Sequence, residues 1–185
     1  FADLLSRITR NYRAQRCKPN WIHIHHSAKM SRQDRDEIAR GVLQESRDAE
    51  ISFVYINEHS TFRLFNSSPR GDGAVERGTW LSVSPNSFRV ATTGPNVIGQ
   101  RYFGTPRPLE VRINRVHERG PLDLSLYAQH ILSLTRLNWA SSRAFCHTPI
   151  TIKFANDIAY LMNVFLATGK PFKLHERLQS TPWFL

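Results

Sequence analysis

The chain has 185 residues, which is enough for one domain with a sizeable hydrophobic core. Its 25 Lys and Arg residues against 15 Asp and Glu residues give a net charge of +10 and a pI near 10.3. This charge favours a polyanionic partner, first nucleic acid and second an anionic membrane, over a purely solubilising role. Two cysteines argue against a disulfide framework and favour the cytoplasm, and no apolar run approaches the roughly 18 residues of a membrane span.

The hydrophobic pattern predicts helices that alternate with strands. An amphipathic helix is predicted for residues 1–16, followed by a short strand at 21–26. Ser31 is the predicted N-cap of a second helix, with Asp34 in its first turn. The apolar run 51–56 is typical of a central strand that is covered on both faces.

The middle of the chain is rich in strand signals. Residues 61–65 and 79–83 are predicted to form a hairpin that is joined by the polar loop 66–78. A helix is predicted for residues 122–137, and the alternation of elements predicts a single α/β layer architecture. Further strand-like stretches lie at 87–93, 99–102 and 109–116.

Residues 134–166 combine a polar, basic stretch with an apolar helical pattern. Pro149 suits the first turn of that helix, because a missing N–H costs nothing there. The pattern predicts a buried helix, with Lys153 and Asn156 projecting from its early turns toward the partner that the preceding basic loop faces. Such a loop and helix suit the binding of an extended anion. The apolar positions of the helix are Phe154, Ile158, Leu161, Met162 and Phe165.

Three short motifs occur in order along the second half of the chain. Residues 104–108 read Gly-Thr-Pro-Arg-Pro, and residues 134–137 read Leu-Thr-Arg-Leu shortly before Ala-Ser at 140–141. Pro149 is then followed by Lys-Phe-Ala-Asn at 153–156. Together these motifs resemble the closing segment of Piwi domains in the Argonaute family, above all the prokaryotic ones. The resemblance implies a ribonuclease H-like α/β fold, with a mixed sheet flanked by helices.

The resemblance extends from about residue 21 to the C-terminus. It implies that residues 1–185 are the C-terminal portion of a Piwi domain, whose first strands and partner domains lie outside this sequence. A chain that does not begin with Met is also expected to be a processed or dissected piece. Apolar surfaces that face the missing part would then favour association.

The catalytic residues of the family provide a second expectation. Active Argonautes resemble ribonuclease H, which cuts a phosphodiester with two metal ions clamped by carboxylates. The resemblance places His26 at the third of four positions, where the family has an Asp, and Asn156 at the fourth, where Asn is compatible with family variation. A neutral imidazole binds one metal through one nitrogen and is a poor ligand for magnesium. The expected protein therefore has no active-site metal pair and no cleavage activity. Nearby carboxylates that do not compensate are Asp34, Asp36 and Asp157.

Cations remain as candidate nucleic-acid ligands. Arg107 matches a family position that touches the nucleic-acid backbone, and its flanking prolines would preset the guanidinium; the alternative is a surface arginine. Arg136 and Arg143 bracket the loop before the last helix, and each is either a phosphate ligand or a solvated charge. Lys153 is a further predicted phosphate ligand, which the backbone N–H groups of the helix start would assist.

The end of the chain is the predicted site of one divalent cation. In prokaryotic relatives the terminal carboxylate helps to hold such a cation in the pocket for the guide 5′-phosphate. The resemblance assigns this role to Leu185, with magnesium or manganese as the cofactor. The alternative is that the aromatic residues before Leu185 simply cap the core.

Two other patterns have simpler interpretations. His23, His25 and His26 suggest a zinc site, but on a strand His23 and His25 share one face while His26 takes the other. Packing or hydrogen bonding is therefore the favoured role for these histidines. The Arg-Gly-Asp sequence at residues 70–72 is interpreted as a turn.

Three functions follow from these observations. The first is an inactive, guide-loaded prokaryotic Argonaute that binds complementary nucleic acid in defence against foreign DNA. Its expected partners are a guide RNA or DNA, the target strand, the remainder of the Argonaute chain and an effector protein, with no membrane. The second is a guide-directed endonuclease that the missing part completes. The third is a basic module that binds an acidic protein.

Overall fold

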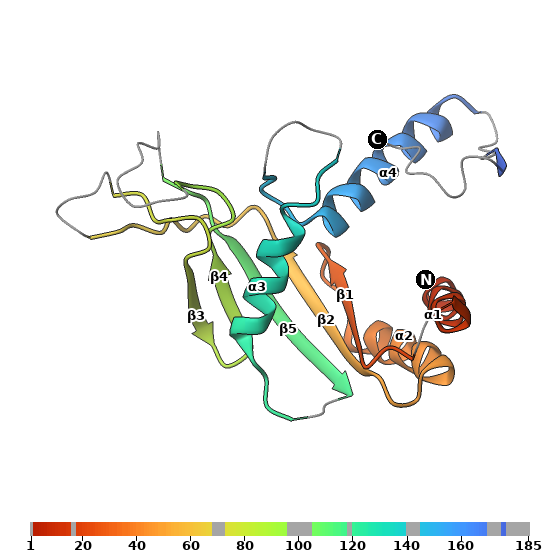
Figure 1. Ribbon diagram of the computed structural model, residues 1–185. Helices are drawn as coiled ribbons and strands as arrows, with labels where there is room; N and C mark the ends of the chain where they lie inside the picture. Colours follow the sequence, from red (N-terminus) through yellow and green to blue (C-terminus); the bar gives the residue numbers. More distant parts are fainter. Residues whose placement is uncertain are drawn as a thin grey trace.

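A five-stranded mixed sheet with helices packed against it is the framework of the protein, shown in Figure 1 as a computed structural model. The strand order is β1-β2-β5-β4-β3, with β1 parallel to β2 and the remaining pairs antiparallel. The structure describes residues 2–15, 18–67, 73–95, 105–117, 120–139, 145–169 and 175–176. In chain order the elements are α1 (Ala2–Gln15), β1 (Trp21–His26), α2 (Arg32–Glu45), β2 (Glu50–Asn57), β3 (Trp80–Ser84), β4 (Ser87–Val90), β5 (Leu109–His117), α3 (Leu124–Leu134) and α4 (Ile150–Ala167).

The two N-terminal helices pack together over β1 and β2. Ser31 caps α2 as predicted, because its hydroxyl accepts from the N–H of Asp34 while the Asp34 carboxylate accepts from the N–H of Ser31. Ile38 and Val42 of α2 are buried in one cluster with Phe53 of β2.

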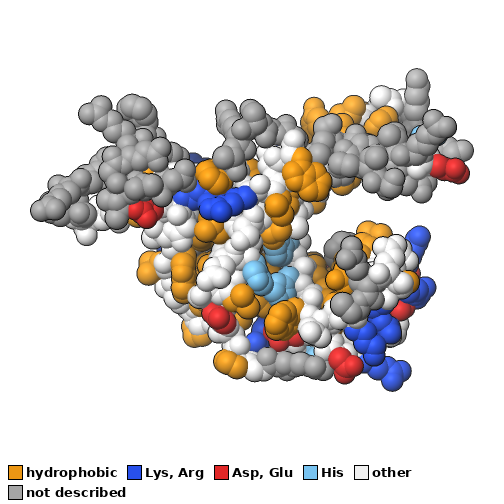
Figure 2. Space-filling model, viewed as in Figure 1, with side chains coloured by type: hydrophobic (Ala, Val, Ile, Leu, Met, Phe, Trp, Pro, Cys, Tyr) orange, Lys and Arg blue, Asp and Glu red, His pale blue; other side chains and the backbone are white. Residues whose placement is uncertain are grey.

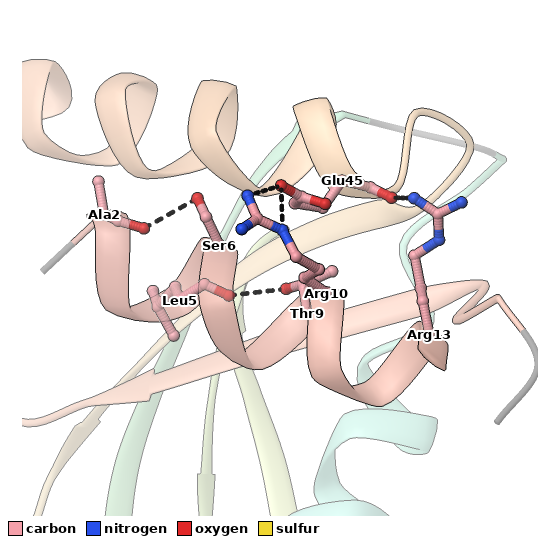
Figure 3. Close-up of polar contacts among 7 residues, drawn as sticks. All are labelled: Ala2, Leu5, Ser6, Thr9, Arg10, Arg13 and Glu45. Atoms are coloured by element: carbon pink, nitrogen blue, oxygen red, sulfur yellow. Dashed lines mark hydrogen bonds and ion pairs between the residues drawn. The ribbon is translucent and has the colours of Figure 1, made fainter. Parts of the chain in front are cut away.

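Polar contacts fix α1 on the end of α2. Figure 3 shows Arg10 donating two hydrogen bonds to the Glu45 carboxylate, while Arg13 donates to the Glu45 carbonyl oxygen. The hydroxyls of Ser6 and Thr9 donate to carbonyl oxygens four residues earlier in α1. These contacts hold α1 in place, although its side chains remain largely exposed.

The opposite face of the sheet carries α3. Asp123 caps this helix by accepting from the N–H groups of Ser125 and Leu126. Tyr127 and Ile131 pack with residues of β2, β4 and β5 in the larger core cluster. The expected central strand is confirmed, because β2 lies between β1 and β5 and is buried over most of its length.

The pairing predicted for residues 61–65 is wrong. Residues 61–64 form no strand, and Phe65 makes only an isolated bridge with Ala74. The strand expected at 79–83 is β3, but its partner is β4, which the two intervening residues join in a tight antiparallel turn. A short connection costs less loop-closure entropy than the 66–78 loop would. The strand predicted at 99–102 lies outside the described residues.

The last helix is present, but the prediction that it is buried is wrong. Pro149 is the N-cap of α4, directly ahead of the first turn in which it was expected. Within α4 only Ile150 and Ile152 are buried, and the exposed fractions of Tyr160 and Leu166 are 69% and 72%. Figure 1 shows the helix extending away from the sheet.

The composition of α4 also bears on the membrane prediction. With 18 residues and a mean hydropathy of 1.2, this helix is long and apolar enough to cross a membrane by length and composition alone. The helix meets these two criteria although Lys153 and Asp157 interrupt its apolar pattern. A helix in the core of a larger protein satisfies the same two criteria, so the absence of a membrane partner stays a prediction.

Candidate nucleic-acid interface

The carboxyl end of β1 meets the first turn of α4. A hydrogen bond of 2.8 Å joins His25 Nδ1 to Thr151 Oγ1, although 126 positions separate the two residues. The family-equivalent positions His26 and Asn156 lie on these same two elements. The structure thus brings the two elements together, but through His25 and Thr151. Asn156 itself is exposed.

His26 has its ring on the other side of the strand. Its Nδ1 lies 2.7 Å from the Ala28 carbonyl oxygen, and its ring is tilted against that of Tyr55 at 5.6 Å between centroids. Because a carbonyl oxygen accepts, Nδ1 carries the proton and Nε2 presents the lone pair. Nε2 is buried and has no hydrogen-bond partner within the described part of the chain.

The residues present do not fit a two-metal site. His26 offers one neutral nitrogen, whereas two closely spaced dications require shared anionic oxygens. In the described residues, no three His, Cys, Asp or Glu side chains group closely enough to hold a metal ion. The described residues therefore supply no ligand set for a metal pair.

The other histidines of β1 face α3, as the strand alternation predicted. His23 stacks on Tyr127 with 4.7 Å between ring centroids, and His130 lies 5.6 Å from it. Burial, with repulsion from neighbouring histidines, lowers the pKa of both His23 and His25 to about 4. These histidines are therefore neutral at pH 7. Figure 2 shows histidine side chains at the centre of this face.

A group of cations surrounds residues 145–149, the segment that leads into α4. The guanidinium of Arg136 lies 5.6 Å from the Phe145 ring, and that of Arg77 lies 4.0 Å from the same ring. Burial lowers the pKa of His147, and the positive charge of Arg107 adds to this effect. Burial raises the pKa of the Cys146 thiol, and the positive charge of Lys153 nearby opposes this rise. We call Arg77, Arg107, Arg136 and Lys153 the cationic cluster.

Arg77 is the member of the cluster that sequence reasoning missed. It donates to the carbonyl oxygens of Thr92 and Leu132 at 3.0 and 3.3 Å, and to Thr135 Oγ1 at 2.5 Å. These bonds tie the segment before β3 to the end of α3. Burial, and then the nearby Arg136, lower the pKa of Arg77. No local pattern around residue 77 indicates partners more than fifty positions away.

The remaining candidates differ in their availability. Arg107 and Arg136 are exposed, whereas Lys153 Nζ lies 2.5 Å from the Asp157 carboxylate, so its charge is partly neutralised. Figure 2 shows Lys and Arg side chains gathered beside the end of α3 that leads toward α4. Arg143 and Leu185 lie outside the described residues.

The fold is similar to part of an Argonaute. A five-stranded mixed sheet with flanking helices fits the ribonuclease H-like Piwi part of such proteins, so the predicted fold class is confirmed. The solved structure of the Argonaute from Aquifex aeolicus matches over 86% of this chain, with a TM-score of 0.59 and 20% identical residues. The chain spans 21% of the length of that Argonaute. No family model and no curated protein matches the sequence.

Proposed function

We propose that this chain is the C-terminal part of the Piwi domain of a catalytically inactive prokaryotic Argonaute, which binds a guide strand and its complementary target. The observation that carries the proposal is the cationic cluster on an Argonaute-like fold. Exposed guanidinium groups bind phosphate oxygens irrespective of base sequence. Such contacts suit a protein whose specificity comes from pairing between the guide and the target.

Binding measurements test this assignment. In the protein that contains this chain, the double variant Arg107→Gln/Arg136→Gln should weaken binding of guide–target duplexes by about tenfold and lower the salt slope by about two, one unit for each lost phosphate contact. The matched control is Arg7→Gln/Arg47→Gln, which removes two exposed arginines from the α1–α2 region. Equal binding by the two double variants would contradict the proposal.

The proposed loss of cleavage rests on His26. Its Nδ1 is bonded to the Ala28 carbonyl oxygen, and within the described residues its ring belongs to no group of three or more side chains that could hold a metal ion. We expect a complementary target to stay intact when the guide-loaded protein is incubated with magnesium or manganese. Cutting at a fixed distance from the guide end would favour the endonuclease alternative.

An open strand edge supports a partner from the rest of an Argonaute chain. β1 is the edge strand of the described sheet, and Trp21 at its start is 62% exposed. Unpaired backbone groups on such an edge accept another strand readily. Strands that precede this chain in a longer protein would pair there. Slow amide exchange along β1 in the longer protein, compared with fast exchange in the 185-residue chain, is the expected result.

The proposal also includes a magnesium or manganese ion at the guide 5′-phosphate, held with the terminal carboxylate of Leu185. A chelator should then lower the affinity for a 5′-phosphorylated guide but not for a 5′-hydroxyl guide. A short C-terminal extension, which displaces the carboxylate, should have the same selective effect. Equal affinity for both guides in the unextended protein would contradict this part. A cytoplasmic role in defence against foreign DNA, with a separate effector, completes the proposal.

A further inference from the structure

Among the described residues, the helices α1 and α2 cover one face of the sheet mainly over β1 and β2. The buried residues of α2 pack with residues of β1 and β2, such as Ile24 and Phe53. On β5, Val111 and Ile113 belong to the core on the α3 side, so Arg112 and Asn114 point to the face of α2. Neither of these two polar side chains is buried.

Two adjoining cavities run between α2 and β5 on this face. Their volumes are about 440 and 500 Å³, which is the usual size of ligand pockets. Both are lined by Arg35 and Asn114, so the two cavities adjoin at these residues. We call the two cavities together the basic trough and define it by Lys29, Arg32, Arg35, Tyr55, Arg112 and Asn114.

The charge of the trough is unbalanced. Among its lining residues Arg115 is paired with Glu50 at 3.5 Å, and Arg32 with Asp36 at 3.8 Å. The other charged residues that line it are the cations Lys29, Arg35 and Arg112 and the carboxylate Glu110. Across the described ranges, these three cations take part in none of the ion pairs that the structure shows.

The floor of the trough is aromatic. His26, Tyr55 and Arg112 are direct neighbours in the registers of β1, β2 and β5, so they form one row across the sheet. The rings of His26 and Tyr55 are 5.6 Å apart at their centroids. Arg35 is oriented by donating to the Met30 carbonyl oxygen at 2.7 Å. Two aromatic rings, which are tilted by 51° to each other, therefore lie beside an anchored guanidinium.

One end of the trough lies near the cationic cluster. Arg107 precedes β5 by two residues, and Arg112 lies in the first half of this strand. His26, at the end of β1, lines the same cavity as Arg112, while His25 contacts the start of α4. A strand that leaves the cluster would enter the trough at this end.

We propose that the basic trough binds a single-stranded segment of nucleic acid, with phosphates on Lys29 and Arg112 and a base against Tyr55. This inference rests on the proposed function and adds a second contact surface to it. Separated cations beside an aromatic ring suit an extended polynucleotide, because phosphates and bases alternate along it. A small anion would engage the cations without using the ring.

Paired substrates test the trough. The substrates are a blunt duplex and the same duplex with a single-stranded tail, each measured by fluorescence anisotropy with the protein that contains this chain. The variant Lys29→Gln/Arg112→Gln should bind the tailed duplex about tenfold more weakly and the blunt duplex about as well as the unaltered protein. The matched control, Lys18→Gln/Arg47→Gln, removes the same two residue types elsewhere and should leave both affinities unchanged.

A second pair of variants tests the aromatic floor. Tyr55→Leu should weaken the tailed duplex by about tenfold, whereas Tyr55→Phe, which keeps the ring, should bind like the unaltered protein. A photoreactive thymidine analogue in the tail should crosslink to β2 or β5. Unfolding midpoints of the variants should stay close to that of the unaltered protein, since a loss of folding would weaken both substrates equally.

The outcomes separate the two proposals. One outcome is that Lys29→Gln/Arg112→Gln binds the tailed duplex as tightly as its control variant, while Arg107→Gln/Arg136→Gln binds duplexes more weakly than the unaltered protein. This result would overturn the proposal that the trough binds a single strand and would leave the proposed function intact. If the unaltered protein binds no nucleic acid, both proposals fail. A third outcome is that inorganic phosphate or polyglutamate displaces the tail when its phosphate or carboxylate concentration equals the phosphate concentration of the tail. The trough would then be a general anion site, and the single-strand assignment would be overturned.

Discussion

The helices α2 and α4 differ in composition and in surroundings, and the more apolar helix, α4, is the less buried one, because α2 carries many charged residues whereas α4 is mostly apolar. In α2, Ile38 and Val42 are buried against the sheet and the helix is also contacted by α1. In α4, burial ends after Ile152, and the later apolar residues Tyr160 and Leu166 face solvent. The contrast shows that a helical pattern specifies the helix, whereas the presence of a partner decides whether its apolar side is covered.

The two helices also begin differently. The start of α2 is held by a reciprocal pair of side-chain bonds between Ser31 and Asp34. The start of α4 has no side-chain cap bond, and it is held to the sheet by the hydrogen bond between His25 and Thr151 and by the packing of Ile152 in the larger core cluster. Local chemistry therefore fixes α2, while α4 depends on tertiary contact at one end.

The first prediction compares apolar truncations in the two helices. Ile38→Ala should lower the free energy of unfolding by about 2–5 kcal/mol, because it removes buried methylene groups and leaves a cavity. Leu166→Ala, at a side chain that is 72% exposed, should change it by less than about 0.5 kcal/mol. Urea denaturation of the chain measures both. A large effect of Leu166→Ala would mean that α4 is packed in solution.

The second prediction concerns acid. The pKa values of His23 and His25 are about 4 in the folded chain, below their ordinary value of 6.5, so the unfolded chain binds more protons between these values. The contribution of these two histidines to the free energy of unfolding is fully present above pH 6.5 and is lost as the pH falls toward 4. Since both rings are partly exposed, we expect a loss of about 1 kcal/mol per histidine between pH 7 and 5.

Denaturation curves measured at pH 7 and pH 5 check this effect. The variant His23→Phe keeps a ring to stack on Tyr127 and should reduce the pH dependence. Because His25 bonds to Thr151, hydrogen exchange at the start of α4 should increase in acid before exchange in α2 does. An unchanged unfolding free energy between the two pH values would contradict the burial of these histidines.

The third prediction tests the cap of α2. Ser31→Ala should cost about 1 kcal/mol, because the hydroxyl that accepts the Asp34 N–H is lost. Ser31→Thr retains a hydroxyl and serves as the control, with a smaller change expected. Thermal unfolding of the three proteins provides the comparison. An equal loss in both variants would show that the hydroxyl is not responsible.

The fourth prediction separates stability from binding at α4. Lys153→Gln removes the ion pair with Asp157 and should cost only about 0.3–0.5 kcal/mol, as expected for a pair one turn apart on a helix. The same change should weaken nucleic-acid binding by several-fold if Lys153 contacts phosphate. Binding that follows the unfolding free energy alone would remove Lys153 from the proposed interface.

Local patterns predicted those parts of the fold that short-range chemistry controls. The cap at Ser31, the strand at residues 21–26 and the opposite faces of His25 and His26 all follow from neighbouring residues. Strand pairing depends on which of several possible connections closes most readily, and a local pattern does not show this. The sequence therefore predicts that residues 61–65 pair with residues 79–83, whereas β3 pairs with β4.

The candidate site depended even more on distant contacts. Arg107, Arg136 and Lys153 were identified as cations, but their common position around residues 145–149 comes only from the packing of α3, α4 and β5. Arg77 gave no sequence signal, because an arginine in a loop looks the same whether it is solvated or bonded to a helix end 55 positions away. The exposed side of α4 could not be foreseen, since a helix pattern carries no information about its partner.

The position of β5 in the sheet has a consequence for synthesis on the ribosome. β1 and β2 are close in sequence, and β3 and β4 form a hairpin, but β5 alone joins the two pairs. While residues 109–117 are still inside the exit tunnel, the nascent chain can hold only two unconnected fragments with exposed apolar faces. The emergence of β5 from the tunnel is then the step that joins the two fragments into one sheet. A translational pause before residue 109 would prolong the exposure of aggregation-prone intermediates.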